Sequence, residues 1–321
     1  MGGKALKTTT GERLDAKSYR ALAAEILAPL RDHYPQVGDV PAYRAKQDFG
    51  DLDILIEYDG PMGRMEEKVK ELFKPEELVT NGNCISLAKS GFQVDLIAAS
   101  NYEMAMVYFA YNDLGSMIGT VAHGFGLKLG PAGLSLPIRL NGGTTELGRP
   151  KVTEVPEQVL GFLGYDPDLH KKGFDTLDDI FKYATSSPYF DPELFSEAKM
   201  NHQSRVRQKK RPVTTQFLDY LVTTPGLQKY QFNDNPESYF DKIADEFPSA
   251  QLREERDRMV GEYNQQNKSR DRLLAFLPEV PLKGKELGTA LEKLKASTPN
   301  YKEFMERGTD EEIRAALRGM V

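Results

Sequence analysis

Hydrophobic and polar positions repeat with two different periods along this chain, and these periods predict helices and strands. Apolar residues such as Tyr19, Leu22 and Ile26 recur at helical spacing and predict an amphipathic helix over residues 16–34. Short apolar or alternating runs predict strands, and a charged stretch between them predicts a second helix. The predicted strands lie near residues 52–58, 84–88 and 92–98, with the charged helix over 62–73 and a turn at 81–83.

The remainder of the chain changes character towards helices. An apolar segment at 104–109 leads through a polar turn to a helix ending near His123, and a hairpin is expected over 127–138. Short helices are expected at 158–164, 176–184, 192–198 and 214–221, before a Pro/Asn-rich linker at 231–236 and a mainly helical end over 237–321. The sequence therefore predicts an α+β fold, with a mixed antiparallel sheet and helices followed by a mainly helical C-terminal region.

Two aspartates interrupt the first predicted strand. Alternation in a strand sends Asp51 and Asp53 to one face and Leu52 and Ile54 to the other. Two carboxylates in an apolar run repel each other and lose hydration, so they need a cation or a solvent-filled cleft. Taken alone, the pair also fits a chance occurrence, with Asp51 in a turn that enters the strand.

A third aspartate occurs in the same setting about forty residues later. Asp95 lies between Val94 and Leu96, and it would complete a three-carboxylate cage if its strand pairs beside the first. Oxygen ligands of this kind suit Mg²⁺ or Mn²⁺. Asp51, Asp53 and Asp95 are therefore the candidate metal ligands and catalytic residues.

Composition limits the class of protein. The chain has 321 residues, 40% hydrophobic and 28% charged, and contains no apolar run of the roughly 18 residues that a membrane span requires. Cys84 is the only cysteine, which excludes an intrachain disulfide and a cysteine zinc site. The first ten residues lack the apolar segment of a secretory signal. We expect a soluble cytoplasmic protein with neither a membrane nor a disulfide partner.

The net charge of −6 argues against a protein that coats nucleic acid indiscriminately, but it leaves room for a local basic face. Residues 199–211 carry six positive side chains and no acidic one. These candidate nucleic-acid contacts are Lys199, Arg205, Arg207, Lys209, Lys210 and Arg211. The stretch fits either a solvated helix end or a contact with a phosphate backbone.

Several motifs in order resemble a known superfamily. They are the run GDLDILI at residues 50–56, VDLI at 94–97, the pair Tyr108-Phe109, and the helix leading to GLKL at 126–129. Together they resemble the palm of the DNA polymerase beta superfamily of nucleotidyltransferases, and their order and spacing look most like family X polymerases. The resemblance covers roughly residues 40–165.

The resemblance implies a domain organisation. Residues 1–150 would form a nucleotidyltransferase palm with an N-terminal helix, 151–230 a thumb-like helical region with the basic stretch, and 231–321 a helical domain. Near the end, residues 282–291 are similar to a turn in the tail of CCA-adding transfer-RNA nucleotidyltransferases, although a helix N-terminus with nearby lysines also explains them.

The resemblance also implies roles for individual residues. Asp51 and Asp53 would bridge two Mg²⁺ or Mn²⁺ ions, and Asp95 would bind the ion that activates a primer 3′-hydroxyl. Tyr108 and Phe109 would lie beneath the ribose, and Asp113 near the base, while core packing is the alternative for the two aromatic residues.

Two departures from the family pattern affect the nucleotide site. The Gly-Ser pair that cradles the triphosphate is expected near residues 40–44 and is absent. Arg44 and Lys46 would supply charge instead, unless they are ordinary surface cations. The Gly-Ser turn of the sugar pocket is replaced by Tyr111-Asn112.

The expected function is transfer of a nucleoside monophosphate from a nucleoside triphosphate to a nucleic-acid 3′-hydroxyl, RNA or DNA, with release of pyrophosphate. Phosphoryl transfer needs charge neutralised on the attacking and leaving oxygens, and two metals held by three carboxylates do this. One alternative is nucleotidylation of a protein or a small molecule. Another is a catalytically inactive nucleic-acid-binding module, against which the three intact aspartates count.

Overall fold

The structure is a computed structural model that describes residues 5–7, 12–140, 143, 145–196, 198–199, 205 and 211–319. The chain divides into two compact units. The first unit holds the described residues up to Pro137 and those from Arg149 to Ala250. The second holds the described residues between Ile138 and Gly148 and those from Gln251 onward. These divisions lie elsewhere than the boundaries at 150 and 230 expected from sequence.

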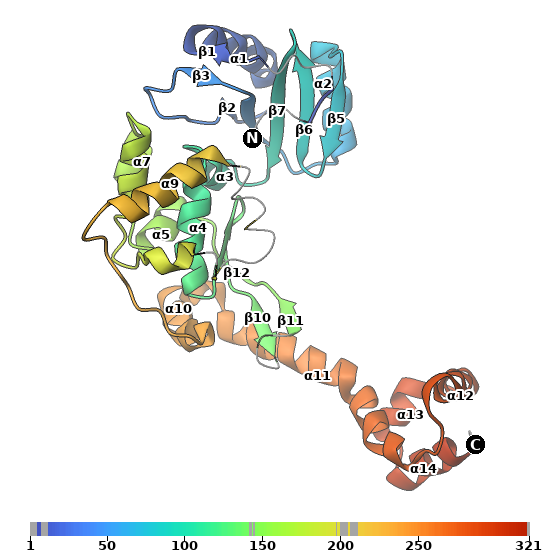
Figure 1. Cartoon of the computed structure of the whole chain (residues 1–321). Coiled ribbons are helices and arrows are strands. Elements are labelled where there is room, and N and C mark those ends of the chain that lie inside the picture. Colours follow the sequence, from blue (N-terminus) through green and yellow to red (C-terminus); the bar gives the residue numbers. More distant parts are fainter. Residues whose placement is uncertain are drawn as a thin grey trace. The chain divides into compact units, whose positions relative to one another are not determined.

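The first unit contains a five-stranded mixed sheet (Figure 1). Its strands are β2 (Val37–Asp39), β4 (Leu52–Glu57), β7 (Phe92–Ala99), β6 (Cys84–Lys89) and β5 (Leu78–Asn81), in that spatial order. Strands β4 and β7 are parallel, and the other neighbours are antiparallel. The predicted turn is present between β5 and β6, where Gly82 adopts a φ of 60°. The predicted α+β class is therefore confirmed.

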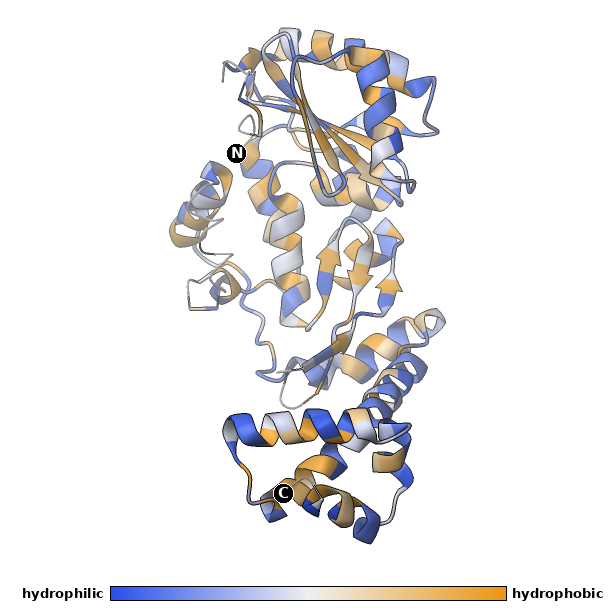
Figure 2. Ribbon diagram, turned by 90° about the vertical axis from the view of Figure 1, so that its right-hand side faces the viewer, coloured by the Kyte–Doolittle hydropathy of each residue, from blue (hydrophilic) through white to orange (hydrophobic). Residues whose placement is uncertain are grey.

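Two helices contribute to the main core of this sheet: α1 (Ala16–Arg31) and α2 (Met62–Phe73). The Asp15 side chain caps α1 by accepting hydrogen bonds from the backbone N–H groups of Lys17 and Ser18. Alternate residues of β4 face these helices, and Leu52, Ile54 and Ile56 are fully buried there. Figure 2 shows hydrophobic residues along the strands, as this packing requires.

Helix α3 (Tyr102–Phe109) belongs to a second, smaller core cluster. Leu55 of β4 and Ile97 of β7 lie in this cluster with Ala105 of α3. Because strand residues alternate between faces, Asp53 and Asp95 share the face of Leu55 and Ile97. This face carries the candidate site.

The remaining elements of the first unit are short, and several segments lie in two further small sheets. In one of these sheets β1 (Leu14–Asp15) pairs with β3 (Asp48–Phe49). In the other, β9 (Gly133–Ser135) pairs with both β8 (Lys128–Gly130) and β12 (Lys151–Thr153). The helices are α4 (Leu114–Gly124), α5 (Pro156–Phe162), α6 (Pro167–Lys172), α7 (Leu177–Ala184), η1 (Pro192–Phe195), α9 (Pro212–Thr223), η2 (Pro236–Tyr239), α10 (Phe240–Glu246) and η3 (Pro248–Ala250).

Most helices and the hairpin of this unit were expected, with two differences. The helix expected over 192–198 is the single 3₁₀ turn η1, whose N-cap Asp191 accepts a hydrogen bond from the backbone N–H of Glu193. Helix α6 was not expected, although its sequence signal is present because Asp166 caps it and Pro167 opens it. Both differences concern single turns, in which apolar periodicity is too short to be diagnostic.

The second unit combines a hairpin with helices. Its elements are β10 (Ile138–Leu140), β11 (Thr145–Gly148), α11 (Leu252–Phe276), η4 (Leu277–Glu279), α12 (Gly284–Ser297), α13 (Tyr301–Arg307) and α14 (Asp310–Arg318). Phe276, Met305 and Ile313 lie in its core. Arg272 donates hydrogen bonds to the carbonyls of Met305 and Gly308 at 3.0 and 2.8 Å, which binds α11 to the end of α13. Among the described residues, no helix combines the length and apolar composition that crossing a membrane requires.

Candidate active site

The three predicted aspartates come together at the first-unit sheet. Asp53 of β4 is the register partner of Asp95 on the parallel strand β7, and Asp51 directly precedes β4. One carboxylate oxygen from each lies within 4.8 Å of those of the other two. The predicted strand pairing is therefore confirmed, and no other group of this size suited to a metal occurs among the described residues.

Burial and mutual repulsion make this cluster electrostatically costly. Burial, followed by the charges of Asp51 and Asp95, raises the pKa of Asp53 to about 7. Burial also raises the pKa of Asp51 and of Asp95. None of the three makes an ion pair with a described residue. A divalent cation would remove this unfavourable charge, and an all-oxygen donor set suits Mg²⁺ or Mn²⁺.

Two uncharged side chains hold the Asp95 carboxylate. The Gln93 amide nitrogen lies 3.0 and 2.9 Å from its two oxygens, and a hydrogen bond from Ser86 also favours its charged form. Gln93 is two residues before Asp95 and therefore on the same face of β7. Sequence reasoning missed Gln93, although this spacing was visible.

Two cations lie near the carboxylates. Lys46 is half-buried, and its ammonium group lies 4.6 Å from the centre of the Phe49 ring. Burial lowers the pKa of Lys46, and the charges of Asp51 and Asp53 oppose that effect. Arg13 forms an ion pair with Asp48. Lys46 was a candidate from sequence, whereas Arg13 was not, because nothing in its local sequence marks its partner.

The side chain of Arg44 bonds residues outside the carboxylate cluster. Its guanidinium pairs with Asp175 and donates hydrogen bonds to the carbonyls of Lys172 and Gly173 at 3.1 and 3.4 Å. Its backbone N–H also donates to the carbonyl of Phe174 at 3.0 Å. The structure therefore places Arg44 in a connection between the β2–β3 loop and the segment after α6. A contact with triphosphate stays a prediction for this residue.

Tyr108 and Phe109 end helix α3, and both are half-buried. Phe109 packs against the smaller core cluster and lies edge-on to Tyr108, with ring centres 5.2 Å apart. Tyr111 and Asn112 follow with φ angles of 59° and 65°, in the left-handed region that favours glycine. The chain therefore makes a turn with two positive φ angles at Tyr111 and Asn112.

Asp113 and Arg211 were candidates for different partners, and the structure brings them together. The Arg211 guanidinium donates to the Asp113 carboxylate at 2.6 Å, and the Thr214 hydroxyl lies 3.1 Å from the same carboxylate. This links the start of α4 to the start of α9. This geometry does not test the predicted role of Asp113 near a base or the predicted role of Arg211 at a phosphate.

Only part of the basic stretch can be placed. Lys199 is exposed and Arg205 is half-buried. Arg207, Lys209 and Lys210 lie outside the described residues.

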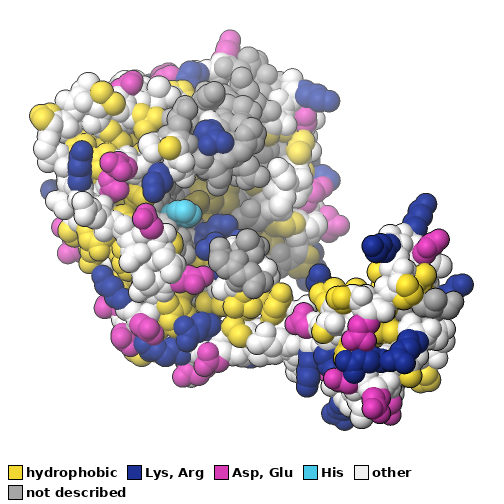
Figure 3. All heavy atoms as spheres, turned by 60° about the horizontal axis from the view of Figure 1, so that its bottom comes forward, with side chains coloured by type: hydrophobic (Ala, Val, Ile, Leu, Met, Phe, Trp, Pro, Cys, Tyr) yellow, Lys and Arg dark blue, Asp and Glu magenta, His cyan; other side chains and the backbone are white. Residues whose placement is uncertain are grey.

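A second basic position occurs on the three-stranded sheet. Lys128 and Lys151 are both register partners of Ser135, so the three side chains form a row across β8, β9 and β12. They line a hollow of about 280 Å³, to which Arg149 also contributes. Gly130 and Gly133 are also among its lining residues. On the face drawn in Figure 3, basic and acidic side chains are intermixed.

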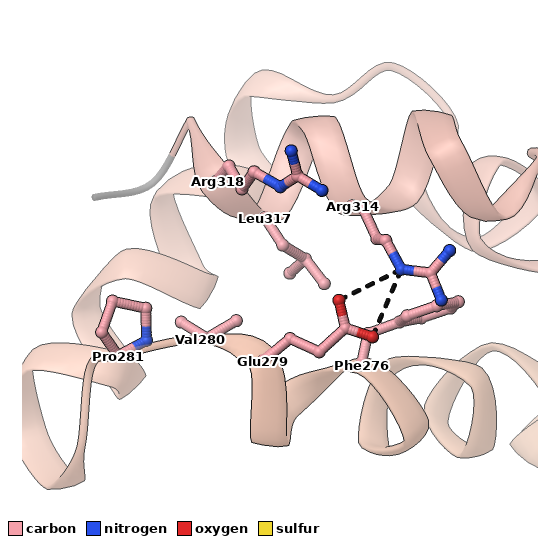
Figure 4. Close-up of a pocket in the computed structure, with 7 residues that line it drawn as sticks. All are labelled: Phe276, Glu279, Val280, Pro281, Arg314, Leu317 and Arg318. Carbon is pink, nitrogen blue, oxygen red and sulfur yellow. Dashed lines mark hydrogen bonds and ion pairs between the residues drawn. The ribbon is translucent and has the colours of Figure 1, made fainter.

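The second unit has its own hollow, of about 240 Å³ (Figure 4). It is lined by Phe276, Glu279, Val280, Pro281, Arg314, Leu317 and Arg318. The Arg314 Nε lies 3.2 and 3.1 Å from the two Glu279 oxygens, and the guanidinium lies 4.8 Å from the Phe276 ring centre. In this hollow, the positive and the negative charge of the ion pair both come from side chains of the protein.

Comparison with known proteins adds no relative to this picture. The chain matches no protein-family model and no curated protein sequence.

Proposed function

We propose that this protein is a metal-dependent nucleotidyltransferase built on a nucleotidyltransferase palm. It would transfer a nucleoside monophosphate from a nucleoside triphosphate to a nucleic-acid 3′-hydroxyl. The observation that carries the proposal is the meeting of Asp51, Asp53 and Asp95 at one place on the mixed sheet. A half-buried group of three carboxylates with no paired cation among the described residues is poorly suited to a purely structural role.

In the proposed reaction, the acceptor 3′-oxygen bonds to the α-phosphorus while the bond to the bridging oxygen breaks, so pyrophosphate leaves. Two divalent ions would neutralise charge on the attacking and leaving oxygens. The three aspartates would hold those ions. Gln93 and Ser86 keep the Asp95 carboxylate in a fixed orientation through hydrogen bonds.

The triphosphate requires further positive charge, because the Gly-Ser pair of the superfamily is missing. Lys46 fits this role, since it is half-buried and feels the charges of Asp51 and Asp53. Arg13 adds a second positive charge that favours the ionised form of Asp51. When divalent ions neutralise the three carboxylates, Lys46 becomes available to the phosphates, while Arg13 stays paired with Asp48.

A polyanionic acceptor is favoured over a protein or a small molecule by two groups of basic residues. One is the sequence stretch 199–211, and the other lines the hollow at Lys128 and Lys151, of which Lys151 pairs with Glu154. Phosphate groups are attracted to such cations. The inactive-module alternative is disfavoured because a binding module has no need for the three carboxylates.

The test is primer extension with purified protein. Labelled RNA and DNA primers, single-stranded and templated, are incubated with each triphosphate in turn and with Mg²⁺ or Mn²⁺. We expect longer products and released pyrophosphate with the wild type, and neither product with Asp53→Asn. Asp59→Asn is the matched control, because Asp59 is an exposed acid in the loop after β4. Absence of extension and pyrophosphate under every condition would reject the proposal.

A further inference from the structure

Gln93 is a buried polar side chain whose amide nitrogen bonds one end of the carboxylate cluster. It is 3% exposed, and its amide nitrogen contacts both oxygens of Asp95, at 3.0 and 2.9 Å. Contact with both oxygens restricts rotation of the carboxylate about its last bond. The donor is neutral, so it orients the carboxylate and leaves its negative charge available.

The other end of the Gln93 amide is fixed by the N-terminal segment. The backbone N–H of Ala5 donates to the Gln93 oxygen at 3.0 Å. Because an N–H can bond only to the amide oxygen, this contact assigns the oxygen to Ala5 and the nitrogen to Asp95. The segment is held by two more contacts: Leu6 is 6% exposed, and the Lys7 backbone N–H donates to Glu77 at 2.8 Å.

We propose that Gln93 is a positioning residue for Asp95, and that the segment Ala5–Lys7 fixes the direction in which its amide points. This inference rests on the proposed metal-dependent function. Side chains that orient metal ligands typically contribute about 10-fold to 100-fold to metal affinity. Hydrogen bonds link Ala5 to Gln93 and Gln93 to Asp95. They make an N-terminal segment part of the proposed metal site, although this segment lies some ninety residues from Asp95 in sequence.

Two variants separate positioning from packing. Gln93→Leu keeps a side chain of similar volume and removes the hydrogen bonds to Asp95 and from Ala5. Ala5→Pro removes only the N–H that orients the amide, on a residue whose own side chain is exposed. Two matched controls accompany them. Gln36→Leu makes the same change at an exposed position beside β2, and Lys7→Pro removes the neighbouring N–H that bonds Glu77.

The measurement is Mn²⁺ binding to the whole protein by isothermal titration, beside the Mn²⁺ dependence of nucleotidyl transfer. We expect Gln93→Leu to weaken Mn²⁺ binding about 10-fold to 100-fold. Ala5→Pro should weaken it by less than about tenfold, since one neutral hydrogen bond is lost. Saturating Mn²⁺ should restore most of the turnover in both variants, which a general loss of folded structure would not allow. Gln36→Leu should bind Mn²⁺ like the wild type, and Lys7→Pro, which loosens the segment but keeps the Ala5 N–H, should lose less affinity than Ala5→Pro.

The outcomes distinguish this inference from the proposed function. If the wild type binds Mn²⁺ and loses it in Asp53→Asn, while Gln93→Leu binds normally, the positioning role is rejected and the metal site stands. Equal losses in Ala5→Pro and Lys7→Pro would reject the specific role of the Ala5 N–H. If the wild type binds no Mn²⁺, the proposed metal site fails and this inference fails with it.

Discussion

Each unit of this protein contains a group of charged side chains, and the two groups differ in how their charges are balanced. In the second unit, Glu279 is bonded to Arg314, and Arg314 lies over the Phe276 ring. In the first unit, three carboxylates lie within 4.8 Å of one another and none makes an ion pair with a described residue. Charge that is balanced within the chain is typical of a structural contact. Charge that is buried and unbalanced destabilises the fold and indicates that a ligand supplies the opposite sign.

The largest expected effect comes from removing one of the unbalanced charges. Asp53→Asn should lower nucleotidyl transfer about a thousandfold or more, because metal ions supply several kcal/mol of charge stabilisation and each 1.36 kcal/mol is tenfold in rate. The same variant should be more stable than the wild type in the absence of metal, since a repelled and buried charge is gone. Primer extension and urea unfolding with a chelator measure the two effects.

A catalytic loss without this gain in metal-free stability would contradict the view that the cluster is electrostatically strained. Asp59→Asn removes an exposed acid of the same unit and is the control for both measurements. It should leave both transfer and unfolding close to wild type.

The histidines allow the two units to be compared in how their stability depends on pH. The four histidines, His33, His123, His170 and His202, all lie outside the residues assigned to the second unit. His170 is 5% exposed, and burial lowers its pKa from 6.5 to about 4. Its ring contacts those of Tyr111 and Tyr183, and its Nε2 has no hydrogen-bond partner among the described residues.

We therefore expect an acid-side loss of stability from His170. Between pH about 6.5 and about 4 the unfolded chain binds a proton that the folded chain excludes, so the free energy of unfolding falls as pH falls, by about 3 kcal/mol in total. His170→Phe should remove this part of the pH dependence, and the exposed His33→Gln should keep it. Urea unfolding at pH about 7 and about 5 measures the difference. An unchanged slope in His170→Phe would assign the acid sensitivity to other groups.

Much of the first-unit sheet was predictable because its residues alternate. A period of two predicts that the side chains of Asp53 and Ile54 point to opposite faces of the sheet, and in the structure they do. Helix α2 has the predicted bounds, because a charged amphipathic run and flanking turns mark its ends. The three metal-ligand candidates were predictable for a related reason, since Asp53 and Asp95 are carboxylates in apolar strands and Asp51 directly precedes the first of these strands.

Pairings across long sequence separations were not predictable. Arg44 bonds Asp175, and Arg211 bonds Asp113, at separations of 131 and 98 residues. A single sequence shows that these residues are charged and does not show which partner the fold supplies. The hydrogen bond from Ala5 to Gln93 is even harder to predict from sequence, because its donor is a backbone N–H and the Ala5 side chain gives no sign of it.

Removing charge from the hollow lined by Lys128 and Lys151 should have an effect of intermediate size. Replacing Lys128 and Lys151 with Ala should weaken binding of a single-stranded oligonucleotide. It should also reduce the slope of log affinity against log salt by about 0.7 for each phosphate that the protein no longer neutralises. Replacing Arg207, Lys209 and Lys210 together tests the basic sequence stretch in the same way. If neither variant changes the salt slope, a polyanionic acceptor loses its support, and nucleotidylation of a protein or small molecule becomes the better hypothesis.

The smallest effect is expected where the charges already balance. Glu279→Gln should leave transfer unchanged and lower stability by less than about 1 kcal/mol, because both side chains are partly exposed at 50% and 35%. Arg314→Ala should destabilise the second unit more than Glu279→Gln does. The arginine also covers Phe276, and its loss exposes that ring as well as breaking the pair. Hydrogen exchange of α11 and α14 measures this difference within the unit. Loss of transfer in Glu279→Gln would mean that this hollow takes part in the reaction, and the contrast between a balanced structural pair and an unbalanced ligand site would no longer hold.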